Sequence, residues 1–570
     1  MKKTVSFATG SRLNAAVYAT RPAAGIATPA ALSAVKASRL SFLRILIARM
    51  AKERWRIAKQ RFDLDDCGRG VAVYRIDAAD QPLHFVVFSD QLEETARTDR
   101  IIANHYDGEA FLCLGEVTAE RIAAQRGEFA DFLYGRADIE TLGWTRVNRS
   151  GRIFDHVVDA LASGRQPDID RLMEAGYLLR NNGYWGNGRH GSASFAGLPA
   201  DTAIGEPYHG DLLTLYLWRQ FSHDLVDHMA ARRGTTGAVR LHPALKRYLG
   251  VGNASGLGLI PFVIRHPQRI HNWCAARESV ITRAKAMPAD RTAIAGLGTI
   301  VARAIAYYSE GIQVRAGIFA GSARLTADLE RLAARIAAQG DALSWSTLCH
   351  WATDALHPEA LETLHSALIE LFPDLCGDAL AAMRRSASPP EAVDPAQSAT
   401  ELLAILETRY DWALAIDRTL PQARRHFWYL SADNLEPRHG VRGVDPMEEY
   451  ETFVDVAGMM QSLRDALLAA PPGQTLDRLL FARPDLRHAV ARVQASDGYP
   501  YGEVRANIID ADFEPCHLIR FLLTAYGMEK LDPQSRLWVR GTFLQGAPLA
   551  EDIAAGKEGD WIYPWRPELG

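Results

Sequence analysis

Two glycine-rich stretches, residues 180–195 and residues 248–264, constrain the fold of this chain more than any other feature. Glycine lets the backbone turn tightly and approach a ligand closely, at a cost in conformational entropy. Regular helix is not expected between residues 180 and 194, and the periodic run before them predicts a loop that leaves a helix end. The glycines are Gly183, Gly186, Gly188 and Gly191 in the first stretch, and Gly250, Gly252, Gly256 and Gly258 in the second.

The first stretch surrounds its glycines with hydrogen-bond donors, a titrating group and aromatic side chains. Arg180 or Arg189 is expected to hold a carboxylate or phosphate, because the planar guanidinium matches both anions. His190 titrates near neutrality and is expected to move a proton. The alternative is a surface loop whose glycines only turn the chain. The predicted substrate-binding residues are Arg180, Asn182, Tyr184, Trp185, Asn187 and Gly188, and the predicted catalytic residues are Arg189 and His190.

The second stretch matches the dinucleotide-binding fingerprint only loosely. Its sixth position is Ser255 instead of glycine, and the residues before it have a helical pattern, where the fingerprint needs a strand. A helix beginning after the stretch would offer unpaired amides to an anion. Close packing of helices through glycine is the equal alternative. The residues expected to bind substrate here are Gly252, Asn253, Ser255 and Gly256, together with His266, which precedes Pro267 at a break between helices.

Ionisable residues gather between 206 and 228, on a segment with helical periodicity. His223 shares a helix face with Asp227, and Asp224 shares one with His228, so either pair would suit a base oriented by a carboxylate. His223, Asp224 and His228 are therefore further catalytic candidates. The two histidines are not at the four-residue spacing of a metalloprotease helix, and no metal site is predicted. The alternative is a helix whose apolar residues are buried while these groups flank them.

The chain is expected to have an α+β fold, helix-rich and multi-domain, because 570 residues exceed one ordinary core. Val-rich and aromatic runs at 70–76 and 84–88 predict a hairpin in a small antiparallel sheet near residues 70–115, and the central region is mostly helical. The expected organisation is a flexible basic N-terminal segment (1–38), a basic helix with antiparallel strands (39–117), a helical domain with the glycine stretches (118–383), a linker (384–398) and a mixed C-terminal α/β domain (399–570).

Charge and cysteine usage narrow the class of protein. The net charge of −4 gives no global attraction for nucleic acid. Six cysteines without a CxxC pair predict reduced thiols and a cytoplasmic location. The basic amphipathic segment 40–62 suits either a membrane surface or docking on its own domain, and we favour docking. A homo-oligomer is expected.

These patterns predict an enzyme that acts on a small carboxylate- or phosphate-bearing metabolite by His-assisted acid–base chemistry, with a lyase-type reaction and no cofactor favoured. One alternative is an oxidoreductase in which the glycine stretches hold a flavin or a nicotinamide nucleotide. Another is a non-catalytic scaffold that binds a membrane or a partner. The enzyme hypothesis requires residues near 185–191 and 250–258 to lie together in the fold.

Overall fold

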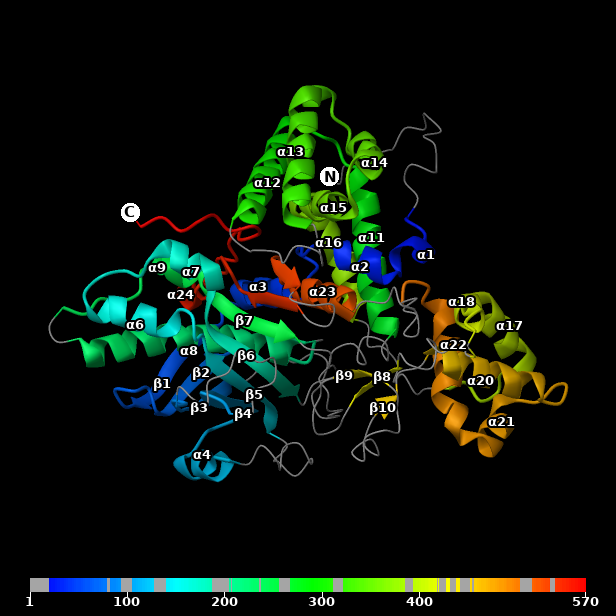
Figure 1. The fold of residues 1–570 in the computed structure, drawn as a ribbon, viewed down its shortest axis with the longest axis horizontal. Helices are drawn as coiled ribbons and strands as arrows, with labels where there is room; N and C mark the ends of the chain where they lie inside the picture. The colour runs from blue at the N-terminus through cyan, green and yellow to red at the C-terminus, as the bar shows by residue number, and fades with distance from the viewer. Residues whose placement is uncertain are drawn as a thin grey trace, which may run out of the picture.

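The computed structural model describes residues 20–78, 82–93, 105–127, 140–186, 204–206, 208–234, 237–255, 267–310, 321–384, 393–417, 419, 427–430, 437–440, 452–453, 456–502, 515–533 and 539–569. A nine-stranded sheet forms the centre, a layer of helices covers one side of it, and a separate group of C-terminal helices lies beyond its end (Figure 1). The α+β class is therefore confirmed, but the sheet is much larger than predicted.

Six strands form an antiparallel meander in chain order. Residues rich in valine and aromatics build its middle, as β-propensity favours, and the predicted hairpin is the pair β2–β3. The expected small sheet near 70–115 instead continues with two further strands, at 141–149 and 177–186, in a region that the sequence predicts to be helical. The strands are β1 (Arg56–Leu64), β2 (Gly70–Asp77), β3 (Pro82–Ser89), β4 (Gly108–Leu114), β5 (Thr141–Arg149) and β6 (Tyr177–Gly186).

The direction of the sheet changes after β6. The next strand, β7 (Gly250–Ser255), runs parallel to β6, whereas β12 (Val539–Phe543) is antiparallel to β7 and β11 (Leu531–Pro533) completes the edge. Residues 531–533 and 539–543 thus belong to the central sheet although they follow the predicted linker. The connection from β6 to β7 contains two helices, α8 (His209–Arg233) and α9 (Pro243–Tyr248).

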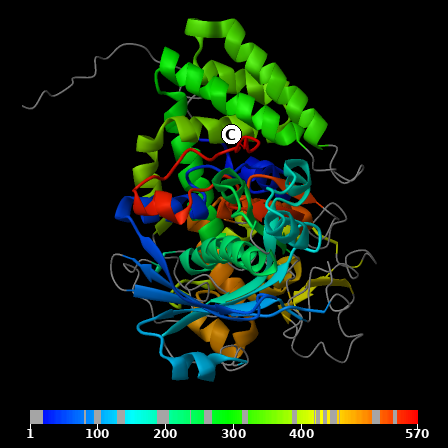
Figure 2. The same cartoon turned by 90° about the vertical axis from the view of Figure 1, so that its left-hand side faces the viewer.

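The helix α8 lies along one face of the sheet, and the short helix α4 (Ala119–Gln125) lies beyond the other (Figure 2). Trp218 of α8 meets Phe85 of β3 edge to face, with ring centroids 5.3 Å apart. On the opposite face, Phe111 and Trp144 form a smaller apolar cluster that includes Ile122 of α4. Both faces of the middle strands β3, β4 and β5 are therefore buried, whereas β1 is mostly exposed. The helices α6 (Phe154–Ala162) and α7 (Ile169–Ala175) connect β5 to β6.

The N-terminal part of the chain is packed into the helical layer. Residues 20–38 contain two short helices and are largely buried, so the flexible segment predicted for 1–38 does not extend over them. The basic helix ends at Glu53, because Arg54 adopts a left-handed φ of 55°, and residues 56–64 then form β1 instead of continuing the helix. The apolar face of this helix is buried in the protein. The three helices are α1 (Ala23–Ile26), α2 (Pro29–Ala34) and α3 (Phe42–Glu53).

Two further groups of helices complete the fold. Among the described residues of the helical layer, the buried apolar side chains from Ala284 to Leu368 form a core of their own, whereas those within 267–281, 376–384 and 515–526 belong to the main core. Within the described ranges, no helix combines the length and apolarity needed to cross a membrane. The helical layer comprises α11 (Pro267–Lys285), α12 (Arg291–Ser309), α13 (Gly321–Gln339), α14 (Trp345–Ala355), α15 (Pro358–Leu371), α16 (Cys376–Arg384) and α23 (Pro515–Tyr526).

The C-terminal group contains α17 (Ala399–Arg409), α18 (Asp411–Leu414), α20 (Val456–Leu468), α21 (Leu476–Ala482) and α22 (Arg487–Gly498). A three-stranded sheet of β8 (Phe427–Leu430), β9 (Pro437–Gly440) and β10 (Thr452–Phe453) lies between this group and the central sheet in Figure 1. The short helix α24 (Ala550–Ala554) follows β12.

Candidate active site

The described parts of the two glycine stretches lie side by side on the parallel strands β6 and β7. Arg180 is paired with Gly252, and Asn181 with Asn253. Because the strands run in the same direction, their carboxyl ends lie at the same edge of the sheet. Ligands of open α/β sheets bind at such an edge, where the strand order or direction switches. Six predicted site residues, Asn187, Gly188, Arg189, His190, Gly256 and His266, lie outside the described residues.

The first stretch is a strand as far as Gly186, not a loop leaving a helix end. The preceding helix stops at Ala175, because Gly176 takes a left-handed φ of 75° and its amide bonds back to the carbonyl of Leu172. Pairing with β5 on one side and β7 on the other then holds the backbone extended. The backbone of Trp185 pairs with Trp144, and that of Ser255 with Val539.

An irregularity in the pairing of β5 and β6 decides which side chains face α8. The register shifts between Arg146 and Val147, so Asn182 is the extra residue of a β-bulge. Asn181 consequently donates from Nδ2 to Thr145 Oγ1 at 2.7 Å, and Trp218 of α8 donates to the same hydroxyl at 3.1 Å. Asn182 instead donates to Asn148 Oδ1.

Arg180 lies across from Asn148 in the register and is 7% exposed. It therefore belongs with Asn182 to the face of the sheet that α8 does not cover. The two predicted substrate-binding residues Arg180 and Asn182 are thus separated by the sheet from Asn181, which the sequence pattern did not single out.

Several glycines in and beside the two strands allow close packing, Gly250 and Gly252 toward the amino end of β7. A Cβ at Gly252 would lie 2.7 Å from the ring of Tyr177, and one at Gly250 only 1.8 Å from the carbonyl oxygen of Phe543. These two glycines fit the packing alternative, although strands are packed here, not helices. On the α8 face, a Cβ at Gly143 or Gly210 would lie 2.5 or 2.7 Å from the Tyr184 hydroxyl, so both glycines make room for that side chain.

Tyr184 places its hydroxyl beside the first turn of α8, where Asp211 is the acidic residue. Burial raises the pKa of Asp211 to about 7. Among the described residues, none donates a hydrogen bond to this carboxylate. Burial, reinforced by the charge of Asp211, also raises the pKa of Tyr184, so its hydroxyl stays protonated at neutral pH. A partly buried carboxylic acid thus stands at the carboxyl end of β6.

Two further tyrosines and an arginine complete this cluster. Tyr208 precedes α8 with a left-handed φ of 62°, a conformation uncommon for residues other than glycine and often found at functional sites. Its ring lies 4.6 Å from that of Tyr526 at the end of α23, and its hydroxyl is hydrogen-bonded to Tyr526 and to Arg269 of α11. Burial raises the pKa of Tyr208 to about 12 although Arg269 opposes the shift. Burial lowers the pKa of Arg269.

The electrostatic neighbours show that these groups form one constellation. Asp211 raises the pKa values of Tyr184, Tyr208 and Tyr526, whereas Arg269 lowers those of Tyr208 and Tyr526. Four elements, β6, α8, α11 and α23, contribute one side chain each, and Tyr208 comes from the position just before α8. We refer to Tyr184, Tyr208, Asp211, Arg269 and Tyr526 as the Asp211 cluster.

The catalytic pairs predicted on α8 do not form. Asp224 accepts from the hydroxyl of Tyr74 at 2.8 Å, and His228 Nε2 lies 3.0–3.1 Å from the carbonyl oxygens of residues 64 and 65. Asp227 accepts from Lys246 and from the amide of Leu241.

His223 is fully buried, and burial together with Arg219 and Lys246 lowers its pKa well below the usual range. These predictions on α8 are therefore not supported. Asp224, Asp227 and His228 bond to groups of other elements, and burial favours the neutral form of His223.

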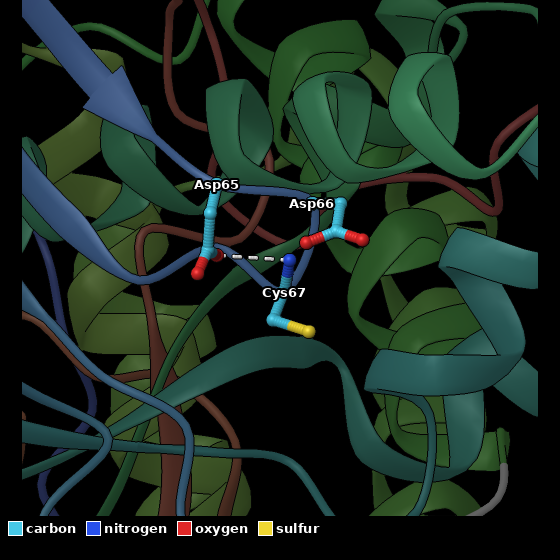
Figure 3. Close-up of side chains that lie close together, drawn as sticks. All are labelled: Asp65, Asp66 and Cys67. Carbon is cyan, nitrogen blue, oxygen red and sulfur yellow. Dashed lines mark hydrogen bonds between the residues drawn. The ribbon is translucent and has the colours of Figure 1, made fainter.

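One small acidic group occurs elsewhere, in the turn between β1 and β2. Figure 3 shows Asp65, Asp66 and Cys67 with their ligand-type atoms close together. Asp65 Oδ1 accepts from the amides of Cys67 and Arg69 at 2.9 and 2.8 Å, which is the bonding of a turn-forming aspartate. Asp65 and Asp66 are exposed, and this group is a turn and not part of the candidate active site.

Sequence reasoning missed most of the Asp211 cluster. The signal available was Asp211 in the first turn of the helix that follows the first glycine stretch. Tyr208, Arg269 and Tyr526 carry no local signal, because only the tertiary fold brings them together. Comparison with protein-family models finds no match for this chain, and comparisons with curated proteins and with solved structures find none either.

Proposed function

We propose that this protein is an enzyme that acts on a small anionic metabolite by acid–base chemistry, with a lyase-type reaction favoured. The observation that carries the proposal is the position of Asp211. Its carboxyl group lies in the first turn of α8, beside the carboxyl ends of the two parallel strands that carry the glycine stretches. Residues 187–203 and 256–266, which include His190 and Arg189, follow directly from these strand ends.

Asp211 is suited to be the acid–base group. A catalytic acid or base works best when its pKa lies near the operating pH, and burial raises that of Asp211 to about 7. At neutral pH the carboxyl group is divided between its charged and protonated forms, so it can take a proton in one step and return it in the next. His190 is the proposed partner for the opposite proton transfer.

The tyrosines supply hydrogen-bond donors. Burial keeps Tyr184, Tyr208 and Tyr526 protonated, and a protonated hydroxyl can donate to an oxygen on which negative charge develops. Removing one such fixed donor from an oxyanion site typically costs about 3–4 kcal/mol in barrier height.

Arg269 is the proposed anchor for the anion. Its guanidinium already bonds to the Tyr208 hydroxyl, which orients it within the cluster. The amides at the start of α8 are a weaker candidate, because the carboxylate of Asp211 stands in the same turn and would repel a phosphate there. For this reason we favour a carboxylate substrate over a phosphate ester.

A screen for turnover tests the proposal. The purified protein is incubated with mixtures of small carboxylates and phosphate esters, and product formation is followed by NMR. We expect Asp211→Asn and His190→Ala to abolish turnover with little loss of folding. Asp159→Asn changes an exposed aspartate of α6 that pairs with Arg233 and serves as the matched control. If Asp211→Asn retains the wild-type rate, the assignment of the site is wrong.

A nucleotide-dependent oxidoreductase is the second candidate. The parallel unit β6–α8–β7 favours it, since Gly183 and Gly186 lie toward the carboxyl end of β6, at the edge where such folds bind nucleotides. Asp211 at the start of α8 counts against a diphosphate in the usual position. Visible absorbance of the purified protein distinguishes a bound flavin from the cofactor-independent enzyme.

A further inference from the structure

The segment that follows α24 is held to the rest of the protein through side chains. Gly556 and Lys557 still bond to backbone carbonyls of α24, but residues 558–566 make no backbone-to-backbone hydrogen bond within the described part of the chain. They contain no helix or strand either. In both views this red segment lies between the green helices of the helical layer and the central sheet (Figure 1, Figure 2). The cost of ordering it must therefore be offset by contacts that involve side chains.

Two ion pairs hold this segment against different elements. Arg303 of α12 lies 2.7 Å from the carboxylate of Asp560 and donates from Nε to the carbonyl of Tyr563 at 3.1 Å. Arg39, which precedes α3, lies 2.5 Å from the carboxylate of Glu558. The side chains of Glu558 and Asp560 are 35% and 65% exposed. Because water and salt reach both carboxylates, these attractions weaken as the ionic strength rises.

Three consecutive side chains of the segment join the two larger apolar cores. Trp561 is buried in the main core, where the guanidinium of Arg44 lies 4.6 Å from its ring. Ile562 and Tyr563 are buried in the core of the helical layer. Their burial favours the closed segment, but ordering about ten residues costs a comparable amount of free energy. Tyr563 adds strain, because it adopts a left-handed φ of 48°. The closed state therefore depends on a small difference between opposing terms.

The segment also contacts residues 527–530, which connect α23 to β11. The amide of Tyr563 donates to Glu529 Oε2 at 2.8 Å, and the hydroxyl of Tyr308 in α12 donates to the carbonyl of Glu529 at 3.3 Å. The rings of Tyr563 and Tyr308 pack together with centroids 5.6 Å apart. The connector directly follows Tyr526 of the candidate site. The position of Tyr563 therefore helps to fix the end of α23 that carries this tyrosine.

We propose that residues 557–566 form a latch that opens while the rest of the protein stays folded, and that its opening releases the connector between α23 and β11. Rising ionic strength opens the latch, since its two ion pairs are the contacts that water reaches. A local opening of this kind has a lower free energy than global unfolding, and it exposes only the amides that it frees. The inference does not depend on the proposed function, because hydrogen exchange measures the opening without a substrate.

Hydrogen exchange of the full-length protein at about 50 mM and about 500 mM NaCl tests the inference. Peptides that cover residues 527–533 and 558–566 report on the connector and the latch, and peptides from β2 and β3 report on the rest of the fold. We expect exchange in the first two peptides to be about threefold faster or more at high salt, with no change in β2 and β3. Equal acceleration in all peptides, or no acceleration in the latch, would overturn the inference.

Matched variants assign the opening to the latch contacts. Asp560→Asn removes the charge that pairs with Arg303, and it should accelerate exchange of the latch at low salt and reduce the effect of salt. Asp341→Asn is the control, because this aspartate is 64% exposed and lies 2.6 Å from Arg291 at the start of the same helix; it should behave as the wild type. Trp561→Ala should free the latch and the connector further, with β2 and β3 still protected. Wild-type exchange in Asp560→Asn, or loss of protection throughout Trp561→Ala, would contradict a separate latch.

Discussion

Replacing Arg219 with methionine is expected to destabilise the edge of the sheet on which the candidate site depends. Arg219 lies in the middle of α8, is 2% exposed, and donates to five backbone carbonyls at 2.8–3.1 Å. These carbonyls belong to residues 246, 247 and 249, which precede β7, and to residues 547 and 548, which follow β12. One guanidinium thus joins α8 to both neighbouring strands.

The size of the destabilisation depends on how many of the five carbonyls would have no donor after Arg219 is replaced. Tyr216 still donates to Pro548, the amide of Gly546 to Arg247, and His223 still bonds to the backbone of Leu249. The carbonyls of residues 246 and 547 have no other donor among the described residues. At about 1–3 kcal/mol for each unsatisfied buried group, the loss would be about 2–6 kcal/mol.

Part of this loss is offset. Burial lowers the pKa of Arg219 to about 10, which shows that burying this cation has a cost that methionine avoids. We therefore expect a net destabilisation of about 2–4 kcal/mol, which is the lower part of the range of about 2–6 kcal/mol.

Urea unfolding followed by circular dichroism measures the change in the free energy of unfolding. Hydrogen exchange should lose protection in residues 250–255 and 539–543 but not in β2 or β3. Arg247→Met removes a neighbouring arginine that is half exposed and pairs with Asp552, and it is the matched control, with little effect expected. If Arg219→Met is as stable as the wild type, or more stable, the guanidinium does not hold these strands and the reasoning is refuted.

Two further predictions concern charge. The pKa of Asp211 rises from about 3.9 in the unfolded chain to about 7 in the folded protein, so its contribution to stability is complete below pH 4 and is lost as the pH rises through 7. In urea unfolding at a series of pH values, Asp211→Asn should lack this decline in the free energy of unfolding. An identical pH profile for the variant and the wild type would contradict the burial of the carboxyl group. Arg21→Ala leaves Arg277 as the remaining arginine paired with Glu278 and Glu362, beside His365, and should cost about 2–3 kcal/mol, whereas a loss near zero would mean that these ion pairs do not anchor the N-terminal segment.

Local pattern predicted several elements of the fold. Runs rich in valine and aromatic residues predicted β2 and β3, and helical patterns predicted α8, α9 and a mostly helical central region, in which α11–α15 lie. α13 ends at Gln339, before Gly340, whose φ of 48° is the left-handed conformation that glycine adopts readily at a helix end. These features depend on residues close together in the sequence.

Long-range pairing accounts for what the pattern did not predict. β6 contains glycine and polar residues that favour a loop, and it is a strand because β5 and β7 flank it. β12 comes from the far end of the chain, so nothing local indicates that it joins β7. The β-bulge turns Asn181 instead of Asn182 toward α8, and the predicted pairs on α8 do not form because Asp224 and Asp227 bond to Tyr74 and Lys246.

The pH dependence of turnover tests the central claim, that Asp211 is the acid–base group at the edge of β6 and β7. With a substrate from the screen, kcat/KM is measured between pH 5 and 9 for the wild type and for Asp211→Asn. We expect kcat/KM of the wild type to change with pH around an inflection near pH 7. We expect Asp211→Asn to lose about 100-fold or more in kcat/KM and to lack this inflection. A variant with the wild-type kcat/KM and the same inflection would contradict the assignment of Asp211 as the acid–base group.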